Sequence, residues 1–189
     1  MQDPQHITLI GCGNMGRAML EGWRNLQDQF SFTVFDPALS DGDIKSLQSE
    51  TVTVVNDNAG LKDKTDCLVM AVKPQIMEEA CGTVKHIAEN KTVIISIAAG
   101  KTIESFEQVF GDHQPIIRTM PNTPAAIGKG TIAGTANKHV TMTQKTIAEK
   151  LLAPLGLFKW AEQESQLDAV TALSGSGPAY VFLFLESLR

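Results

Sequence analysis

Three glycines near the N-terminus have the spacing of a turn that binds a dinucleotide. Gly11, Gly13 and Gly16 form the pattern G-x-G-x-x-G between the apolar run 6–10 and a helical pattern. In such a turn the first glycine allows a tight bend, the second lets the backbone approach a pyrophosphate, and the third lets the helix pack closely on the strand. The phosphates would lie at the positive end of a helix that starts near Asn14. The run therefore predicts a dinucleotide site.

An acidic residue follows the next predicted strand, at the position that selects between two forms of the cofactor. Asp36 lies twenty residues after Gly16 and directly after the strand 32–35. A carboxylate there accepts hydrogen bonds from ribose hydroxyls and repels a 2′-phosphate. The next basic residue along the chain is Lys45. This position favours NAD(H), although Asp36 followed by Pro37 is also typical of a turn that simply ends a strand.

The end of the fourth predicted strand carries a lysine. Lys73 follows Ala71 and Val72, and Pro74 stops the strand. Ligands of doubly wound sheets bind beyond the carboxyl ends of the strands, so the ammonium group would face a phosphate or carboxylate. A solvated lysine at a strand end is the alternative interpretation.

Two more strand ends have the composition of a ligand site. Ile97, Ala98 and Ala99 end the fifth strand with small residues that let a ring or a ribose approach the backbone. The loop 118–125 after the sixth strand contains two prolines and several hydrogen-bonding side chains. Such loops often line substrate pockets, and they also occur without any function.

Other kinds of chemistry have little support. The four histidines are scattered and none has a second ligand at metal spacing, so no metal is expected. Ser174 and Ser176 lie among glycines, but the chain has no G-x-S-x-G motif for a nucleophilic serine. No catalytic residue is therefore predicted.

Composition is that of an ordinary globular protein. The 189 residues are 43% hydrophobic with a net charge of −5 and no block of basic residues, which argues against a nucleic-acid surface. Three cysteines without C-x-x-C spacing indicate a reduced compartment. The first residues lack the basic and apolar regions of a signal peptide, and the longest apolar run, 179–185, is too short to cross a bilayer. A cytoplasmic protein is expected.

Alternating strands and helices position these candidates. Strands are expected at 6–10, 32–35, 52–55, 66–72, 92–98, 115–119, 130–134 and 157–161. Helices are expected at 14–28, 40–49, 75–89, 102–110, 143–153 and 178–189. Strands that are apolar on both faces indicate a parallel sheet covered by helices on each side. The predicted fold class is α/β: a doubly wound Rossmann-type sheet of about eight mostly parallel strands in residues 1–162.

Residues 163–189 have a different pattern. The segment 173–178 is predicted to be a turn, with Pro178 at the first position of a final helix. That helix is apolar nearly all the way round, so several of its sides must be buried. We expect either another subunit or further chain, from which this sequence would be truncated, to cover it.

Five motifs together resemble one enzyme family. They are IGCGNMG at 10–16, AVKP at 71–74, SIAAG at 96–100, RTMPNTPA at 118–125 and LSGSGPAY at 173–180. The chain resembles the pyrroline-5-carboxylate reductase family over essentially all of its length. The resemblance implies NAD(P)H-dependent reduction of the cyclic imine 1-pyrroline-5-carboxylate to L-proline, the last step of proline synthesis. It also implies that 163–189 begin an all-helical dimerisation domain.

The resemblance implies a cofactor site along the strand ends. With Asp36, its residues are Ile10, Gly11, Cys12, Gly13, Asn14, Met15, Asn58, Ala71, Val72, Lys73, Pro74, Ile97, Ala98 and Ala99. Candidates for the substrate pocket are Asn122, Thr123, Ser174 and Ser176. The family usually favours NADPH, whereas Asp36 favours NADH, so either NADP(H) or NAD(H) is expected.

The family also continues past residue 189 with helices that complete an intertwined homodimer, or a higher homo-oligomer, and hold the substrate. Two alternatives to the reductase stay open at this point. One is a related oxidoreductase acting on another imine or a 3-hydroxy acid, although the serine-glycine segment disfavours the hydroxy acid. The other is an NAD(P)-binding module or fragment without catalysis. Hydride transfer to an easily protonated imine depends on positioning more than on a strong acid, so the lack of an evident catalytic side chain fits the reductase.

Overall fold

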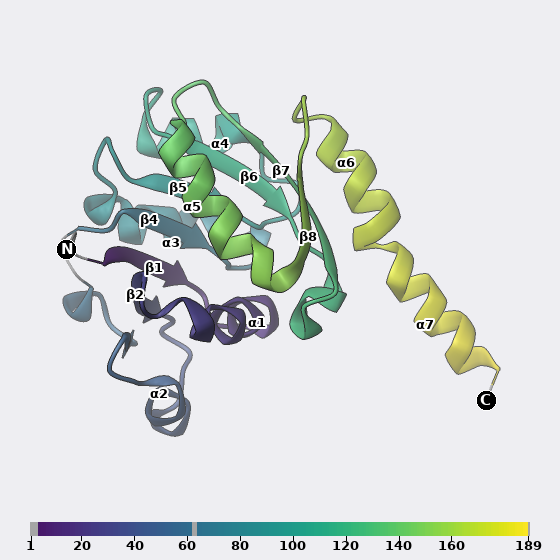
Figure 1. Ribbon diagram of the computed structural model, residues 1–189, viewed down its shortest axis with the longest axis horizontal. Coiled ribbons are helices and arrows are strands. Elements are labelled where there is room, and N and C mark those ends of the chain that lie inside the picture. The colour runs from purple at the N-terminus through teal and green to yellow at the C-terminus, as the bar shows by residue number, and fades with distance from the viewer. Residues whose placement is uncertain (1–3, 62–63, 189) are drawn as a thin grey trace.

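A computed structural model describes residues 4–61 and 64–188 (Figure 1). The first three residues, on which part of the signal-peptide argument depends, and Arg189, the last residue of the expected final helix, lie outside the described residues. The chain forms one eight-stranded sheet with helices on both faces, and a helical arm extends from it. The doubly wound α/β fold expected from the sequence is confirmed.

The strands agree closely with the expected ones. They are β1 Gln5–Ile10, β2 Phe30–Phe35, β3 Val52–Val55, β4 Cys67–Met70, β5 Val93–Ser96, β6 Ile116–Met120, β7 Gly130–Ala136 and β8 Gly156–Trp160. The helices are α1 Asn14–Gly22, α2 Asp41–Leu47, α3 Met77–Val84, α4 Ile103–Phe110, α5 Met142–Leu152, α6 Gln166–Val170 and α7 Gly177–Ser187. Every expected helix has a counterpart, and α6 was not expected.

The order of the strands defines where a ligand can bind. The sheet order is β3-β2-β1-β4-β5-β6-β7-β8. β1 to β6 are mutually parallel, β7 is antiparallel to β6, and β8 is parallel to β7. The chain moves outward from β1 to β3 and then crosses to β4 on the other side of β1. The switch point lies between β1 and β4, and in such sheets it marks the crevice that binds ligands.

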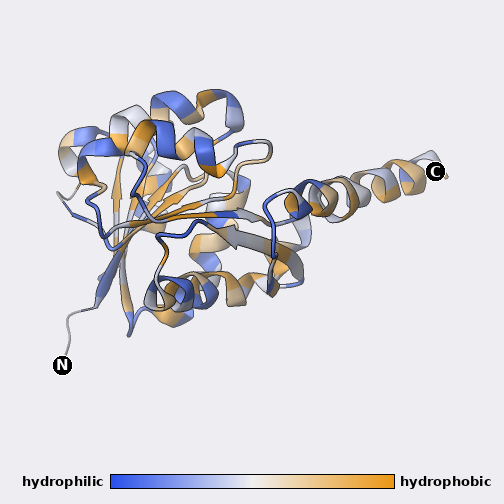
Figure 2. Ribbon diagram, turned by 90° about the horizontal axis from the view of Figure 1, so that it is seen from above, coloured by the Kyte–Doolittle hydropathy of each residue, from blue (hydrophilic) through white to orange (hydrophobic). Residues whose placement is uncertain are grey.

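Two apolar layers hold helices against the sheet. On one face, Leu9 of β1 packs in a cluster with Trp23 after α1 and Leu151 of α5. On the other face, Met70 of β4 packs with Phe106 of α4 and with α3. Figure 2 shows helices on both sides of the sheet. The two-sided burial explains why the central strands are apolar throughout.

Two long predicted helices are interrupted. The helix expected at 14–28 ends at Gly22 and continues as a 3₁₀ turn over Trp23–Leu26. The helix expected at 75–89 is α3 flanked by 3₁₀ turns at Pro74–Ile76 and Lys85–Ile87. Helix ends often tighten in this way to satisfy their last carbonyl groups, which hydropathy patterns do not reveal.

The turn expected at 173–178 is wrong. Thr171–Gly175 is a π-helical segment that joins α6 to α7 in one nearly continuous rod (Figure 1). The Ser174 hydroxyl donates to the Val170 carbonyl, and the Ser176 amide donates to the Thr171 carbonyl at 2.9 Å. Serines and glycines usually indicate a turn, but here the backbone bond from Ser176 continues the helix, and the Ser174 hydroxyl bonds back to a carbonyl of the preceding turn. Pro178 is accordingly the second residue of α7 and not the first.

The rod carries α7 away from the sheet (Figure 2). Tyr180 to Leu185 have exposed fractions of 55–72%, although five of these six residues are strongly apolar. In the part of the chain that the structure describes, no helix is long and apolar enough to span a membrane. The arm is therefore a short apolar helix that lies in the open on this chain.

Candidate dinucleotide-binding site

The glycine turn after β1 has the geometry that its spacing predicted. Gly11 has φ of 92°, and an added Cβ would lie 2.8 Å from a methyl carbon of Val72. A Cβ at Gly16 would collide with the carbonyl oxygen of Gly11. The first glycine thus permits the bend and the third permits close contact between helix and turn. Both are required by the protein's own packing.

Gly13 is different, because nothing in the protein explains it. It precedes α1 with an ordinary φ of −71°, no side chain caps the helix, and an added Cβ would meet no described atom within 4 Å. The first amides of a helix have no acceptor inside the helix, and they carry partial positive charge. Open space over uncapped amides is what a bound pyrophosphate needs. The turn therefore fits a dinucleotide cofactor.

Asp36 lies beside this turn and is held by two amides. The Cys12 amide donates to Asp36 Oδ2 at 2.7 Å, and the Ala38 amide donates to Oδ1 at 2.9 Å. The second bond closes a local turn, which is the alternative role that the pair Asp36 and Pro37 indicated. The first bond crosses between strand ends and fixes the carboxylate against the glycine turn. The local turn is therefore present, and the role of Asp36 toward a ribose stays a prediction.

The other predicted cofactor residues lie along the same edge of the sheet. The Ala71 amide donates to the Ile10 carbonyl at 2.8 Å, and the Ile97 amide donates to the Met70 carbonyl at 3.2 Å. These bonds place the ends of β1, β4 and β5 side by side. Lys73 is exposed where β4 leads into the Pro74–Ile76 turn. Asn58 begins the 3₁₀ turn that follows β3.

The structure brings together two of the four substrate-pocket candidates. Asn122, which is almost fully buried, donates to the Ser174 carbonyl at 3.2 Å and accepts from the Thr131 amide at 2.9 Å. Its side chain thus connects the loop after β6 to the helical rod. Thr123, next to Asn122, and Ser176, two residues after Ser174, are both exposed.

Sequence reasoning gave no role to Arg118, which links the two parts of the chain. Its guanidinium is buried at the edge between β6 and α6, with Glu164 Oε1 at 3.0 Å and Asp168 Oδ1 at 3.1 Å. Glu164 Oε1 also accepts from the Ile103 amide at the start of α4. One signal was available: an arginine in a buried strand needs acidic partners, and Glu164 and Asp168 are spaced to share a helix face.

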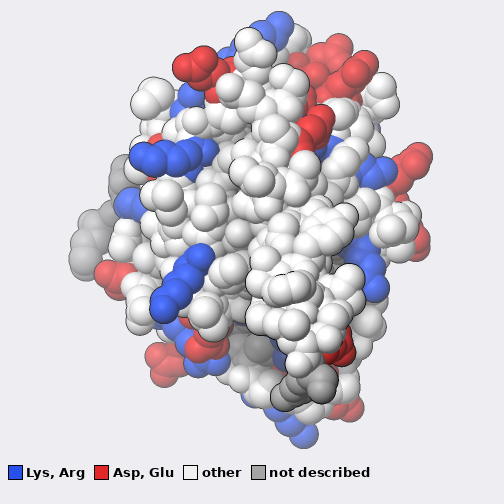
Figure 3. Space-filling model, turned by 90° about the vertical axis from the view of Figure 1, so that its right-hand side faces the viewer, with Lys and Arg blue, Asp and Glu red and all other residues white. Residues whose placement is uncertain are grey.

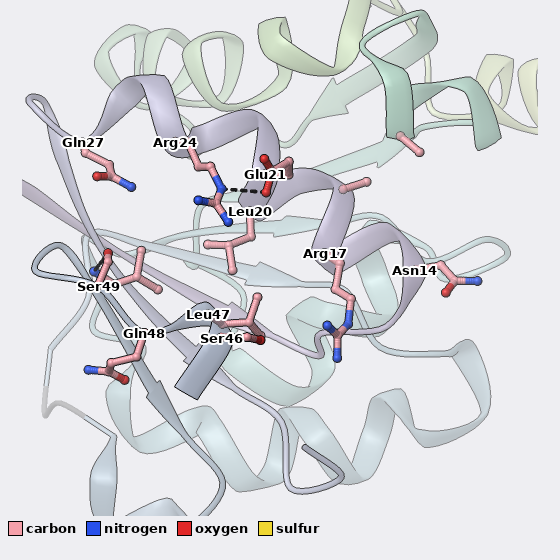
Figure 4. Close-up of a pocket in the computed structure, with 13 residues that line it drawn as sticks. Asn14, Arg17, Leu20, Glu21, Arg24, Gln27, Ser46, Leu47, Gln48 and Ser49 are labelled. Atoms are coloured by element: carbon pink, nitrogen blue, oxygen red, sulfur yellow. Dashed lines mark hydrogen bonds and ion pairs between the residues drawn. The ribbon is translucent and has the colours of Figure 1, made fainter. Parts of the chain in front are cut away.

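A groove of about 410 Å³ lies elsewhere, along the outer side of α1 (Figure 4). It is bordered by α1 and by the segment from Ser46 to Val52, and of the predicted site residues it includes Asn14 alone. Its two arginines are paired: Arg24 contacts Glu21 at 2.6 Å and Arg17 contacts Asp43 at 2.6 Å. Because their charges are compensated, the groove has no evident affinity for an anion.

The cysteines are poor nucleophiles in this fold. Burial raises the pKa of the Cys12 thiol, and it raises that of Cys81 to about 11. All three cysteines are buried and free. In residues 4–61 and 64–188, no three histidine, cysteine or acidic side chains form a group that could hold a metal ion. The predicted cofactor residues at this edge of the sheet thus offer backbone amides, the Asp36 carboxylate, the exposed Lys73 side chain and small uncharged side chains.

The sheet order and the uncapped glycine turn define a dinucleotide-binding protein of the Rossmann class. The chain is 36% identical to pyrroline-5-carboxylate reductase from Pseudomonas aeruginosa over 183 residues, which is 96% of this chain and 67% of that protein. It is 35% identical to the Haemophilus influenzae enzyme, again covering 67% of its length. The chain belongs to the pyrroline-5-carboxylate reductase family.

Family models and solved structures agree with this membership. Residues 6–100 match a model described as NADP oxidoreductase, coenzyme F420-dependent, and residues 164–189 match the model for pyrroline-5-carboxylate reductase dimerisation. A Coxiella burnetii pyrroline-5-carboxylate reductase superposes with a TM-score of 0.86 at 33% identity, with 98% of this chain and 69% of that one covered. A Plasmodium falciparum pyrroline carboxylate reductase with NADP bound superposes with a TM-score of 0.81 at 30% identity, with 100% and 68% covered.

Proposed function

We propose that this chain reduces 1-pyrroline-5-carboxylate to L-proline with a nicotinamide dinucleotide. In this reaction the imine carbon gains a hydride, the ring nitrogen gains a proton, and NAD(P)H is oxidised to NAD(P)⁺. The observation that carries the proposal is the space above Gly13 beside uncapped helix amides, in a chain of this enzyme family. The bound cofactor supplies the hydride, and the protein supplies binding and orientation.

The predicted cofactor residues that follow the strand ends each have a place in this proposal, and Ile10, Gly11 and Cys12 form the end of β1 and the turn that leads to the pyrophosphate. The first turn of α1, from Gly13 to Met15, would bind the pyrophosphate through backbone amides. Asp36 would accept hydrogen bonds from the adenosine ribose. Residues 71–74 and 97–99 would line the half of the crevice that extends toward the nicotinamide, with Asn58 at the adenine side. These assignments follow the order of the strand ends from β3 to β5.

The nicotinamide would lie toward the loop after β6, where the substrate candidates are. We propose that Thr123 and Ser176 face the substrate, while Asn122 and Ser174 hold the loop and the rod in place through their hydrogen bond. A cyclic imine is readily protonated in water, so the protein's main task is to position it for hydride transfer. We assign no proton donor.

The same family relationship supports a proposal for the arm. We propose that residues 1–162 are the dinucleotide-binding domain, that 163–189 begin a dimerisation domain, and that α7 packs against a second copy of the chain. The match of residues 164–189 to the dimerisation model and the exposed apolar side chains of α7 support this. Burial of several leucine and phenylalanine side chains would stabilise such a dimer by roughly 1.5–3 kcal/mol each.

The reductase is tested by following the oxidation of NADH and NADPH with and without the imine. We expect oxidation that depends on the imine and yields proline, and we expect none in a Gly13→Val variant. Nucleotide binding without turnover would instead support the alternative of a non-catalytic binding module. Turnover of other small imines but not of 1-pyrroline-5-carboxylate would indicate a related oxidoreductase.

A further inference from the structure

The segment that joins β5 to α4 is held at its start by the sheet. This β5–α4 segment, 97–102, contains no helix or strand. The Ala98 amide donates to the Ser96 hydroxyl at 3.2 Å, and the Thr119 hydroxyl of β6 donates to the Ser96 carbonyl at 3.0 Å. Gly100 is exposed, with a φ of 72° that suits a turn. The position of this turn depends on how the two ends of the segment are held.

The end of the β5–α4 segment is held by Glu164, which lies far along the chain in the turn before α6. Glu164 Oε1 accepts from the Ile103 amide at 2.9 Å, across a separation of 61 residues. The cap of α4 itself serves another amide, because the Thr102 side chain accepts from the Ser105 amide. The first amides of a helix have no acceptor within the helix, so an acceptor from outside stabilises the start of α4.

The same oxygen of Glu164 also binds Arg118, which lies in β6 just before the loop that carries two substrate candidates. Arg118 Nη1 donates to Glu164 Oε1 at 3.0 Å, and Nη2 donates to Asp168 Oδ1 at 3.1 Å. Glu164 thus lies between a buried guanidinium and the positive end of α4. No hydrogen bond joins the Asp168 side chain to α4 in the described residues. Of these two acids, Glu164 is therefore the one that connects β6, the β5–α4 segment and the start of the helical rod.

We propose that Glu164 is a positioning residue, which keeps the β5–α4 segment at the distance from the loop after β6 that the reaction requires. The inference rests on the proposed function, in which 97–99 line the nicotinamide half of the crevice and the loop after β6 faces the substrate. It deepens that function with a residue that is not among the predicted cofactor or substrate residues. Displacement of a reacting group by about 1 Å can lower a rate by about 100-fold, so a bond that fixes this distance matters for catalysis.

The bond can be removed from either side. Glu164→Ala removes the acceptor, and Ile103→Pro removes the donor while leaving Glu164 and Arg118 in place. Proline suits this position, because Ile103 is the first residue of α4 and Thr102 before it has φ of −85° and ψ of 161°. In both variants we expect the amides at 99–101 to exchange hydrogen about 5-fold faster or more.

The functional measurements use the dinucleotide that binds more tightly, NADH or NADPH. We expect its dissociation constant, from nucleotide fluorescence, to rise about 3-fold or more in both variants. We expect kcat for the oxidation of this dinucleotide with 1-pyrroline-5-carboxylate to fall about 10-fold or more. Glu164→Gln keeps an oxygen that can accept from the Ile103 amide, and it should stay within about 2-fold of the unaltered chain in each measurement.

Two matched controls separate the bond from its surroundings. Ile103→Ala shortens the side chain but keeps the amide, so it controls for the packing lost in Ile103→Pro. Asp168→Ala removes the other acid from Arg118 without touching α4, and its side chain is 73% exposed. Both controls should stay within about 2-fold of the unaltered chain in exchange at 99–101 and in the dissociation constant.

The outcomes separate this inference from the proposed function. Unchanged exchange at 99–101 in folded Glu164→Ala and Ile103→Pro overturns the connection. Faster exchange with an unchanged dissociation constant and kcat overturns the positioning role, because a bond that serves only folding would give this result. Equal effects in Asp168→Ala would assign the effect to the charge of Arg118 and also overturn the role of Glu164. An unaltered chain that binds the dinucleotide but does not reduce the imine contradicts the reductase, while exchange and dissociation constants still decide the role of Glu164.

Discussion

The glycine turn and the α7 arm differ in how far the chain itself buries their side chains. Around the turn, strands and helices bury one another, and the chain's own amides hold Asp36. Along α7, the apolar side chains from Tyr180 to Leu185 are more than half exposed. Figure 3, viewed toward the side from which α7 projects, shows uncharged side chains across the middle and charged ones mostly at the margins. The turn leaves open space above Gly13, whereas the arm exposes apolar side chains of the kind that protein interfaces cover.

The first change fills the open space above the glycine turn. Gly13→Val places a side chain where the pyrophosphate would bind, and we expect nucleotide affinity to fall about 100-fold or more while the melting temperature changes little. The matched control is Gly82→Val in α3, where an added Cβ also meets no atom within 4 Å. Gly82 is not among the predicted cofactor residues, so this variant should leave binding unchanged. Unchanged affinity in Gly13→Val would place the nucleotide elsewhere.

The second change tests the arm. The double substitution Leu183→Lys and Phe184→Lys puts charge on two sides of α7, and we expect a dimer to become a monomer in sedimentation experiments because buried unpaired charges are costly. Nucleotide binding should persist, since the turn lies in the other region. Leu157→Lys on β8 is the control, because Leu157 is exposed to a similar extent outside the arm. A monomeric parent chain, or a double variant that remains dimeric, would contradict the proposed interface.

The third change breaks the connection between the two regions. Arg118→Met leaves Glu164 without its guanidinium partner in a mostly buried position, and we expect the free energy of unfolding to fall by about 2–3 kcal/mol in urea titration. Asp168→Asn should cost much less, because the Asp168 side chain is 73% exposed. Equal losses of unfolding free energy in the two variants would show that burial does not determine how much each ion pair stabilises the protein.

The smallest expected effect is on the pH dependence of stability, through Cys81 in the apolar core. Burial raises the pKa of Cys81 from 9.0 to about 11. The unfolded chain therefore loses this proton first, so the contribution of the neutral thiol to stability is complete below about pH 9 and disappears as the pH rises through about 11. We expect a loss of about 1–2 kcal/mol over this range that a Cys81→Ala variant lacks. If the free energy of unfolding changed with pH in the same way in both proteins, the Cys81 thiol would be excluded as the cause of the loss.

Most of the fold follows from local patterns in the sequence. The apolar strands, the glycine turn and the alternation of strands with helices specify the doubly wound sheet, since each pattern has one main structural solution. Local patterns do not show the end of α1 at Gly22, where Trp23 begins a 3₁₀ turn and donates its indole NH to the Leu151 carbonyl far along the chain. The π-helical segment closes through the bond from the Ser176 amide to the Thr171 carbonyl, although the serine-glycine composition of its motif is typical of a turn.

The candidate site also contains residues whose positions follow from local patterns and residues whose positions depend on contacts with distant parts of the chain. The positions of Gly13 and Asp36 at neighbouring strand ends could be predicted because they depend only on the backbone of adjacent elements. Arg118 was missed because its partners lie 46 and 50 residues away, Glu164 in the turn before α6 and Asp168 in α6, a helix that the sequence did not predict. Asn122 was predicted to lie in a pocket, and the structure adds the two hydrogen bonds that give it a positioning role.

Amide chemical shifts during a titration with NADH test the central claim most directly, because they report where along the backbone the dinucleotide binds. We predict that the largest changes occur at Gly13, Asn14 and Met15, with a smaller change at the Cys12 amide that contacts Asp36. Changes centred on Arg24, Gln27 and Gln48, in the groove along α1, would contradict the account.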